Sequence, residues 1–335
     1  MGNLCKSSVA VAVIILAMLF GSHSFQKSVG SVLVDAGIMS WDETPRVSVA
    51  RSTVRVKGLS SNLTGLRVVQ LSDFHQEAGH NDALIRESVR LANSLKPDVV
   101  LLTGDYINWS PYPHAQHLVQ QHLVHLKARH GVFAVLGNHD YDHPGSKRAV
   151  RAALESIGIL VLGNDATYPF EGEGLAIVGL GDLWHGDAKP SRAFRGVPET
   201  SPRIVLAHNP DTATKLTSYR ADVIVSGHTH GGAVHLPLIG PVYPYIKALH
   251  VFLRDTLNLP KLARYMPYMN VIENSLWVQG LHTVPREDGS GEDNVLHVSR
   301  GVGSHVEKPR LLCDSQVELI VLISGDRTAV VEPWH

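Results

Sequence analysis

Aspartate, asparagine and histidine residues gather in five short motifs along the chain. The motifs are Asp73-Phe74-His75, Gly104-Asp105, Gly137-Asn138-His139-Asp140, Ala207-His208 and Gly227-His228-Thr229-His230-Gly231-Gly232. Carboxylate, amide and imidazole groups suit Mn, Fe, Zn or Co better than Ca or a thiolate-seeking metal. Together the motifs supply enough ligands for two divalent metal ions and leave one histidine over, so they predict a two-metal centre.

Each motif follows a short apolar run of the kind that forms a buried strand. The runs are Leu66 to Leu71, Val99 to Leu102, Val132 to Leu136, Ile204 to Leu206 and Val223 to Val225. Because loops that leave the carboxyl ends of neighbouring strands converge, the five motifs are expected at one edge of a sheet. Apolar periodicity predicts helices over Asp82 to Leu95 and Lys147 to Ile157. This alternation indicates an α/β domain, and the pattern alone is compatible with either a doubly wound sheet or a two-sheet sandwich.

The content and order of the motifs resemble the calcineurin-like metallophosphoesterase superfamily, whose signature is D-x-H, G-D, G-N-H-[DE], H and G-H-x-H. The resemblance covers about Leu66 to His230, with closing strands expected around Val298 to Gly303 and Val317 to Ile323. It implies a four-layer fold, a two-sheet β-sandwich flanked by helices, in a domain over residues 66–335.

The resemblance also implies a role for each motif residue. One ion would be held by Asp73, His75 and His230, the other by Asn138, His208 and His228, and Asp105 would bridge them. Two cations about 3.5–4 Å apart can clamp a phosphoryl group and promote in-line attack by hydroxide. His139 would then protonate the leaving oxygen, a task suited to imidazole. Asp140 would either orient His139 or cap the following turn or helix.

The residues after Asp105 bear on the substrate. Protein phosphatases of the superfamily carry a further Asp-Arg-Gly there, whereas this chain has Tyr106-Ile107-Asn108-Trp109. The missing arginine disfavours a protein phosphatase or phosphomonoesterase, and Asn108 is either a substrate contact or a turn residue. A non-catalytic scaffold is disfavoured because the ligand set is intact.

A finer resemblance concerns a branch of the superfamily. Thr103 to Tyr106, Gly231-Gly232, Leu236 to Gly240 and Ser299 to Gly303 look like the membrane-associated bacterial-type phosphodiesterases, which include chlamydial-type UDP-2,3-diacylglucosamine pyrophosphatases. This resemblance implies hydrolysis of a phosphodiester or diphosphate bond in a lipid-linked or nucleotide-linked substrate.

Two apolar segments point to a membrane. Residues 1–24, with Val9 to Phe20 behind Lys6, read as a signal peptide or membrane anchor, and residues 25–65 as a connecting segment. Residues 236–282 form an apolar, basic insertion in which Ile246, Leu249, Leu253 and Leu257 can share one helical face. The insertion is either a cap over the sheet or a lid that touches lipid beside the site. The protein is therefore expected to be membrane-associated or exported.

Composition excludes one class of partner. The chain has 335 residues and a formal net charge of −1, which argues against a nucleic-acid platform.

Cys313 has no intrachain partner once the segment containing Cys5 is set aside, so no disulfide is expected. His114, His117, His122 and His125 are spaced by 3, 5 and 3 residues and are expected to be solvated helix residues.

Overall fold

The computed structural model describes residues 46–77, 79–108, 113–236, 239–260, 271–304, 310 and 312–325. The expected signal peptide or anchor, and the expected connecting segment up to residue 45, lie outside these ranges. Within them, no helix combines the length and the apolar character needed to cross a bilayer.

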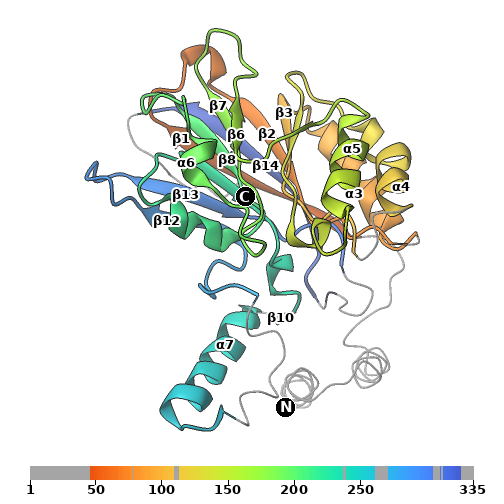
Figure 1. Ribbon diagram of the computed structural model, residues 1–335, viewed down its shortest axis with the longest axis vertical. Helices are drawn as coiled ribbons and strands as arrows, with labels where there is room; N and C mark the ends of the chain where they lie inside the picture. The colour runs from red at the N-terminus through yellow and green to blue at the C-terminus, as the bar shows by residue number, and fades with distance from the viewer. Residues whose placement is uncertain are drawn as a thin grey trace, which may run out of the picture.

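Two six-stranded sheets form the centre of the molecule (Figure 1). The first has the order β1 (Val47–Val56), β14 (Ser315–Ser324), β2 (Leu66–Leu71), β3 (Val99–Leu102), β4 (Val132–Ala134) and β5 (Leu160–Val161). The second has the order β12 (Gly280–Pro285), β13 (Asp293–Val298), β9 (Val223–Ser226), β8 (Arg203–Leu206), β7 (Ala176–Gly179) and β6 (Asp165–Thr167). Strands β2, β3 and β4 run parallel in the first sheet, as do β7, β8 and β9 in the second.

Helices cover the outer faces of both sheets. The first sheet carries α3 (Asp82–Ser94), α4 (His114–Gln121) and α5 (Ser146–Glu155), which group on one side in Figure 1. The second carries α6 (Pro190–Ala193) and a 3₁₀ helix, Pro210–Leu216. A short hairpin of β10 (His235–Leu236) and β11 (Gly240–Pro241) precedes α7 (Tyr243–Val251) and a π-helical turn, Phe252–Thr256.

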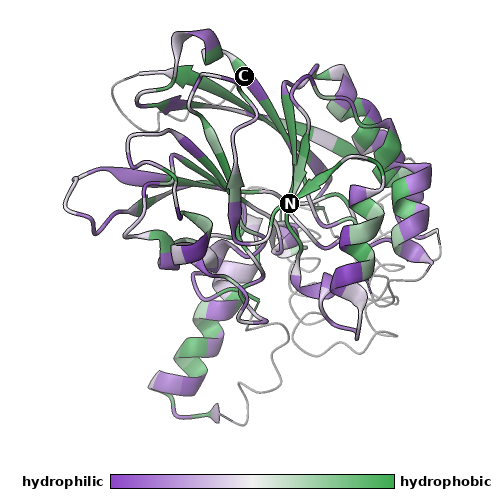
Figure 2. Cartoon of the chain, turned by 45° about the horizontal axis from the view of Figure 1, so that its top comes forward, coloured by the Kyte–Doolittle hydropathy of each residue, from purple (hydrophilic) through white to green (hydrophobic). Residues whose placement is uncertain are grey.

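The strands are apolar on both faces because both faces are buried. In β3, Val99 and Leu101 point into the core between the sheets, whereas Val100 and Leu102 pack under the helices. Figure 2 shows the same concentration of apolar residues along the strands of both sheets. These packed layers confirm the predicted sandwich flanked by helices and exclude a single doubly wound sheet.

The N-terminal boundary predicted at residue 66 is wrong for the described part of the segment. Strand β1 pairs with β14 in parallel over ten residues, from Val47 opposite Ser315 to Val56 opposite Ser324. β1 is an edge strand and only part of it is buried, so it lacks the solid apolar run of a central strand. The expected closing strand at Val298 to Gly303 is also displaced: β13 ends at Val298, and a loop follows it.

The insertion forms a projecting arm, defined here as residues 239–260. Its helix α7 extends away from the sandwich in Figure 1 and does not lie over a sheet. Tyr243 is buried against Ile272 and Val278 at the base of the arm. Farther out, Leu249, Phe252 and Leu257 are 42%, 47% and 48% exposed. Residues 239–260 are therefore no cap over the sheet, whereas Trp277, later in the insertion, packs against the outer face of the second sheet.

Candidate two-metal active site

All five motifs meet at the edge where the two sheets face each other. Parallel pairing places the carboxyl ends of β2, β3 and β4 side by side, and those of β8 and β9 opposite them. The Gln70 side chain of β2 donates a hydrogen bond to the Ser226 carbonyl of β9, 2.8 Å away, and so ties the two sheets together below this edge. The structure brings together every residue predicted as a ligand, namely Asp73, His75, Asp105, Asn138, His208, His228 and His230.

One group of side chains contains Asp73, His75 and His230. The Nε2 atoms of the two histidines lie 3.0 Å apart, and His230 Nε2 lies 3.6 Å from Asp73 Oδ1. Asp105 Oδ2 lies 3.7 Å from His75 Nε2. Four donor atoms therefore converge on one small volume, as the ligands of a metal ion do.

A second group shares Asp105 with the first. His208 Nε2 lies 3.1 Å from Asp105 Oδ2, 3.2 Å from Asn138 Oδ1 and 3.2 Å from His228 Nδ1. Asp105 is the carboxylate common to both groups, so it occupies the position predicted for a bridging ligand.

Main-chain carbonyls fix which histidine nitrogen faces the second group. His208 Nδ1 donates to the Thr103 carbonyl at 2.7 Å, and His228 Nε2 donates to the Val271 carbonyl at 2.9 Å. The opposite nitrogen of each ring therefore points inward, toward the other predicted ligands. A ligating histidine commonly uses its second nitrogen in this way. This donor set fits a divalent ion.

The buried carboxylate of Asp105 favours a positive charge next to it. Burial alone would lower the pKa of His208, but the charge of Asp105 outweighs it and raises that pKa to about 10. For Asp105, burial is likewise outweighed by the charge of His208, and the pKa of the carboxyl falls well below its usual range. Burial raises the pKa of Asp73 to about 6 and, together with the charge of His208, lowers the pKa of His228 to about 3. A bound cation would replace the proton that His208 holds.

The backbone at the motifs is strained. Five of the predicted ligands have a positive φ although none is glycine, and the angles run from 45° to 72°. They are Asp73, His75, Asp105, His228 and His230. Such a conformation costs roughly 1 kcal/mol or more for each residue, and it collects where surrounding structure holds a functional site in place.

Two glycines allow the motifs to approach each other. Gly104 has φ +99°, and a Cβ there would lie 2.5 Å from the Gly137 nitrogen and 2.8 Å from His208 Nδ1. Gly137 has an ordinary extended φ of −99°, but a Cβ there would collide with the Asp105 carboxylate. Gly104 therefore allows both a left-handed backbone turn and the close approach, whereas Gly137 allows the close approach alone.

Of the two roles expected for Asp140, its contacts favour the cap over the orientation of His139. It is fully buried, and its two oxygens accept hydrogen bonds from main-chain N–H groups of the neighbouring motifs. The donors are Gly137 at 2.8 Å, Asp105 at 3.0 Å, Tyr106 at 2.9 Å and Ile107 at 3.4 Å. Asp140 is therefore a positioning residue that joins the loops after β3 and β4, which is closer to the alternative capping role.

A different carboxylate lies beside His139. Asp142 Oδ2 is 3.0 Å from His139 Nδ1, and Asp142 Oδ1 is 3.8 Å from His185 Nε2. His185 Nδ1 in turn lies 2.8 Å from the buried Asp182. The ring of His185 also stacks on Tyr141 at 5.0 Å between centroids. A chain of alternating imidazole and carboxylate groups thus extends from His139 into the second sheet.

The sequence contained a signal for this sixth motif. Gly181-Asp182-Leu183-Trp184-His185 follows the apolar run Leu175 to Leu180, in the same manner as the other five motifs. Trp184 is 51% exposed and packs edge-on against His228, with 4.5 Å between ring centroids. It places an accessible aromatic surface at the rim of the site.

Asn108, expected to be either a substrate contact or a turn residue, is bonded to another side chain of the protein. Asn108 is 2% exposed, and its side-chain amide donates to Glu77 at 2.6 Å. The motifs did not predict Arg310, which lies beside His230 at the site. Arg310 donates to the carbonyls of Arg300 and Gly303 and lies 3.3 Å from His230 Nδ1. Arg310 therefore braces the loop that carries His230.

The chain is similar to known metallophosphoesterases. Residues 66–232 match the family model for calcineurin-like phosphoesterase. The chain is 28% identical to a UDP-2,3-diacylglucosamine pyrophosphatase, LpxG, of Chlamydia muridarum, over 82% of this chain and 90% of that protein. It is 33% identical to the phosphodiesterase YaeI of Escherichia coli, over 59% of this chain and 75% of that protein. It is 30% identical to a transmembrane protein with metallophosphoesterase domain of Danio rerio, over 63% of this chain and 51% of that protein.

Proposed function

The chain belongs to the calcineurin-like phosphoesterase family, and from that premise we propose that it cleaves a phosphodiester or diphosphate bond in a lipid-linked substrate. Family membership makes it a metal-dependent phosphoester hydrolase. Similarity to LpxG over most of both chains supports a diphosphate joined to a lipid, such as UDP-2,3-diacylglucosamine. The observation that carries the lipid part of the proposal is the projecting arm beside the site.

In the proposed centre, one ion would be held by Asp73, His75 and His230, and the other by Asn138, His208 and His228. Asp105 would contribute to both, because its carboxylate lies between the two groups. When bound, two divalent ions supply the charge that stabilises phosphoryl transfer and lower the pKa of an attacking water. Mn, Fe, Zn and Co all suit these ligands.

His139 is the proposed proton donor to the leaving oxygen. Its main-chain N–H donates to Asp105 Oδ1 at 3.0 Å, so its position is fixed relative to the bridging carboxylate. The side chain is 20% exposed, whereas that of His75 beside it is fully buried. His139 can therefore reach a substrate oxygen from the open side, and Asp142 positions its ring.

The projecting arm is the proposed contact with lipid. Large apolar side chains are exposed along it, namely Ile239, Tyr245, Leu249, Val251, Phe252, Leu257 and Leu259. Lys247 and Arg254 add basic groups, as interfacial helices commonly do. The chain returns from the arm at Val271, whose carbonyl accepts the hydrogen bond from His228 Nε2. Tyr243 of the arm packs against Ile272, the next residue, so the base of the arm lies beside the site. In the proposal the arm holds the acyl chain while the phosphate occupies the site.

The test compares two doubly substituted proteins. Leu249→Ser with Phe252→Ser changes the arm, and Val124→Ser with Tyr168→Ser changes two residues of similar exposure, 47% and 44%, elsewhere. Partial withdrawal of two large apolar side chains from lipid would cost about 2 kcal/mol, or about 30-fold in partitioning. The arm variant should therefore lose vesicle binding and turnover of an acylated nucleotide diphosphate in vesicles by at least about 10-fold.

Hydrolysis of bis-p-nitrophenyl phosphate should stay unchanged in both proteins, because the metal ligands and His139 are untouched. Equal losses on both substrates, with lower thermal stability, would show that the arm only supports the fold. Unchanged turnover of the acylated substrate would remove the arm from the proposal. Activity confined to phosphomonoesters would contradict the proposed bond type.

A further inference from the structure

A second cluster of metal-ligating side chains lies outside the active site, between α3 and α4. Asp82 is the first residue of α3, His117 lies in α4, and His122 follows the last residue of α4. His117 Nε2 is 3.1 Å from Asp82 Oδ2, and His122 Nε2 is 3.1 Å from Asp82 Oδ1. The expectation that these histidines are merely solvated is wrong for His122, which is 4% exposed. None of the three belongs to the proposed two-metal centre.

We propose that Asp82, His117 and His122 bind a divalent transition-metal ion of the Zn²⁺ class. One ligand atom from each residue lies within 4.8 Å of the other two. Ligands about 2.0–2.1 Å from a metal lie about 2.9–3.3 Å from each other at tetrahedral or octahedral angles. The two nitrogen–oxygen distances of 3.1 Å fall in that range. Two imidazoles and one carboxylate are a recurring ligand set for Zn and Fe, and imidazole disfavours Ca and Mg.

An entering ion would displace the Nε2 protons that the two histidines donate to the Asp82 carboxylate. Burial raises the pKa of Asp82, but hydrogen bonds from the two histidines outweigh it and lower that pKa, so the carboxylate is charged. Burial lowers the pKa of His122, so its ring is neutral near pH 7. A metal ion requires a charged carboxylate and a neutral imidazole.

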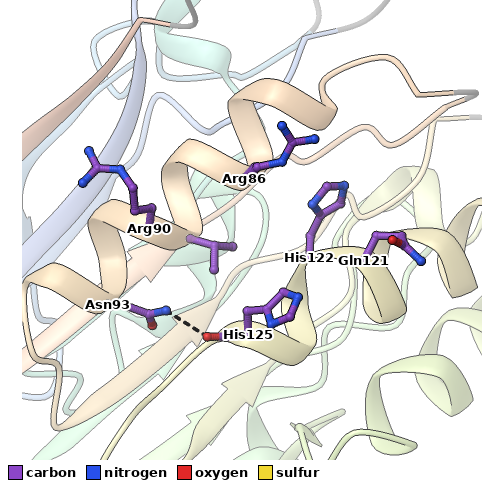
Figure 3. A pocket seen from close by; sticks show the side chains of 7 residues that line it. Arg86, Arg90, Asn93, Gln121, His122 and His125 are labelled. Carbon is purple, nitrogen blue, oxygen red and sulfur yellow. Dashed lines mark hydrogen bonds between the residues drawn. The ribbon is translucent and has the colours of Figure 1, made fainter.

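Access and rigidity also suit an ion. The side chains of Asp82 and His117 are 25% and 41% exposed, so an ion can enter from solvent and water can complete its coordination. The ring of His122 lies edge-on to that of His117, with 5.8 Å between centroids, and it lines a cavity of about 200 Å³ between α3 and the end of α4 (Figure 3). Figure 3 shows Arg86 and Arg90 of α3 along the opposite wall. A fixed ring and an accessible carboxylate give a site that is both preformed and open.

The ion would fasten α4 to the loop that carries His75. Asn81 precedes Asp82, and its side-chain amide donates to the carbonyls of Phe74 and His75 at 3.2 and 3.1 Å and to that of Ser304 at 3.0 Å. Tightening the start of α3 would therefore stiffen one wall of the active site without supplying a group to the reaction. This is a structural site, distinct from the catalytic centre.

The test counts metal ions in the full-length protein. Wild type, Asp82→Asn, His117→Ala and the control His125→Ala would be stripped with chelator, reloaded with Zn²⁺, gel-filtered and assayed by elemental analysis. His125 is an exposed histidine three residues beyond His122 and takes no part in the cluster. Wild type and His125→Ala should hold one more equivalent of zinc than Asp82→Asn and His117→Ala. Loss of a partner outside the ligand shell costs 10–100-fold in affinity, so loss of a ligand should raise the Kd of this ion at least about 100-fold.

Thermal unfolding gives a second readout. Zn²⁺ should raise the Tm of wild type and His125→Ala by more than it raises the Tm of the two cluster variants. The His117 side chain is partly exposed, so His117→Ala should fold without zinc. If His117→Ala fails to fold, the comparison of Asp82→Asn with wild type tests the proposal. Equal zinc content and equal Tm shifts in all four proteins would overturn the proposal. An additional ion that persists in both cluster variants would place it elsewhere and overturn the proposal too.

Discussion

Asp140 and Asp142 are two residues apart, and the structure predicts opposite consequences for replacing them. In Asp140→Ala, the main-chain N–H groups of Gly137, Asp105 and Tyr106 lose acceptors at 2.8, 3.0 and 2.9 Å in a fully buried place. Each buried donor left without a partner costs about 1–3 kcal/mol. Three of them predict a loss of about 3–9 kcal/mol in the free energy of unfolding, a large share of the 5–15 kcal/mol typical of a domain.

The substitution Asp142→Ala should leave stability almost unchanged and lower turnover. The Asp142 side chain is 34% exposed, and its contacts are with His139 and His185. A residue that orients a working histidine typically contributes about 10–100-fold. We therefore expect kcat on a substrate with a poor leaving group to fall by that factor, with metal content unchanged.

The assay is urea unfolding of both variants, alongside kcat on an alkyl diester and on a p-nitrophenyl diester. The p-nitrophenolate leaves without protonation, so Asp142→Ala should recover most of its rate there. If Asp140→Ala were destabilised by less than about 1 kcal/mol, the hydrogen-bond argument would fail. If Asp142→Ala lost equal rate on both diesters, Asp142 would not act through His139.

Three further substitutions test the centre and the core. Asp105→Asn should abolish turnover and reduce occupancy of both ions, which elemental analysis would detect; full occupancy with near-normal turnover would remove the bridging role. His139→Ala should lose about 10²–10⁴-fold in kcat on a poor leaving group while keeping its metal, and an unchanged rate would exclude His139 as the acid. Burial raises the pKa of Glu318 to about 8, so between about pH 4.5 and 8 the folded state holds a proton that the unfolded state has lost, and stability falls as pH rises. Relative to wild type, Glu318→Gln should therefore gain stability across that interval, by up to about 1.4 kcal/mol per pH unit; a flat difference in urea unfolding would show that Glu318 is ionised in the folded protein.

The sequence predicted correctly those strands and helices whose apolar pattern and flanking motifs indicate the same boundaries. β2 and β3 begin and end at the predicted residues, and α3 ends one residue before the predicted Leu95. The predicted ligands meet because parallel strands bring their carboxyl ends to one edge. The sandwich required the family resemblance, since local pattern does not reveal which strands share a sheet.

The failures have physical causes. β1 was not predicted because its sequence lacks a continuous apolar run. As an edge strand it tolerates Arg51, Ser52 and Arg55 between its apolar residues. The role of Asp140 depends on where main-chain amides point, and a sequence carries no record of that direction. His122 was misread because its partner, Asp82, lies on another helix.

The pairing of β1 with β14 has a consequence for biosynthesis. Ser48 contacts Ser315, 267 positions later in the chain, and β14 lies between β1 and β2 in the sheet. A ribosome adds about 5–20 residues per second, so β1 must wait roughly 10–50 seconds for the strand that separates it from β2. During that interval the edges of β1 and β2 stay open to other strands, and the first sheet cannot be completed before β14 has been synthesised. Formation of the first sheet is therefore expected to depend on protection of β1 until β14 is available to pair with it.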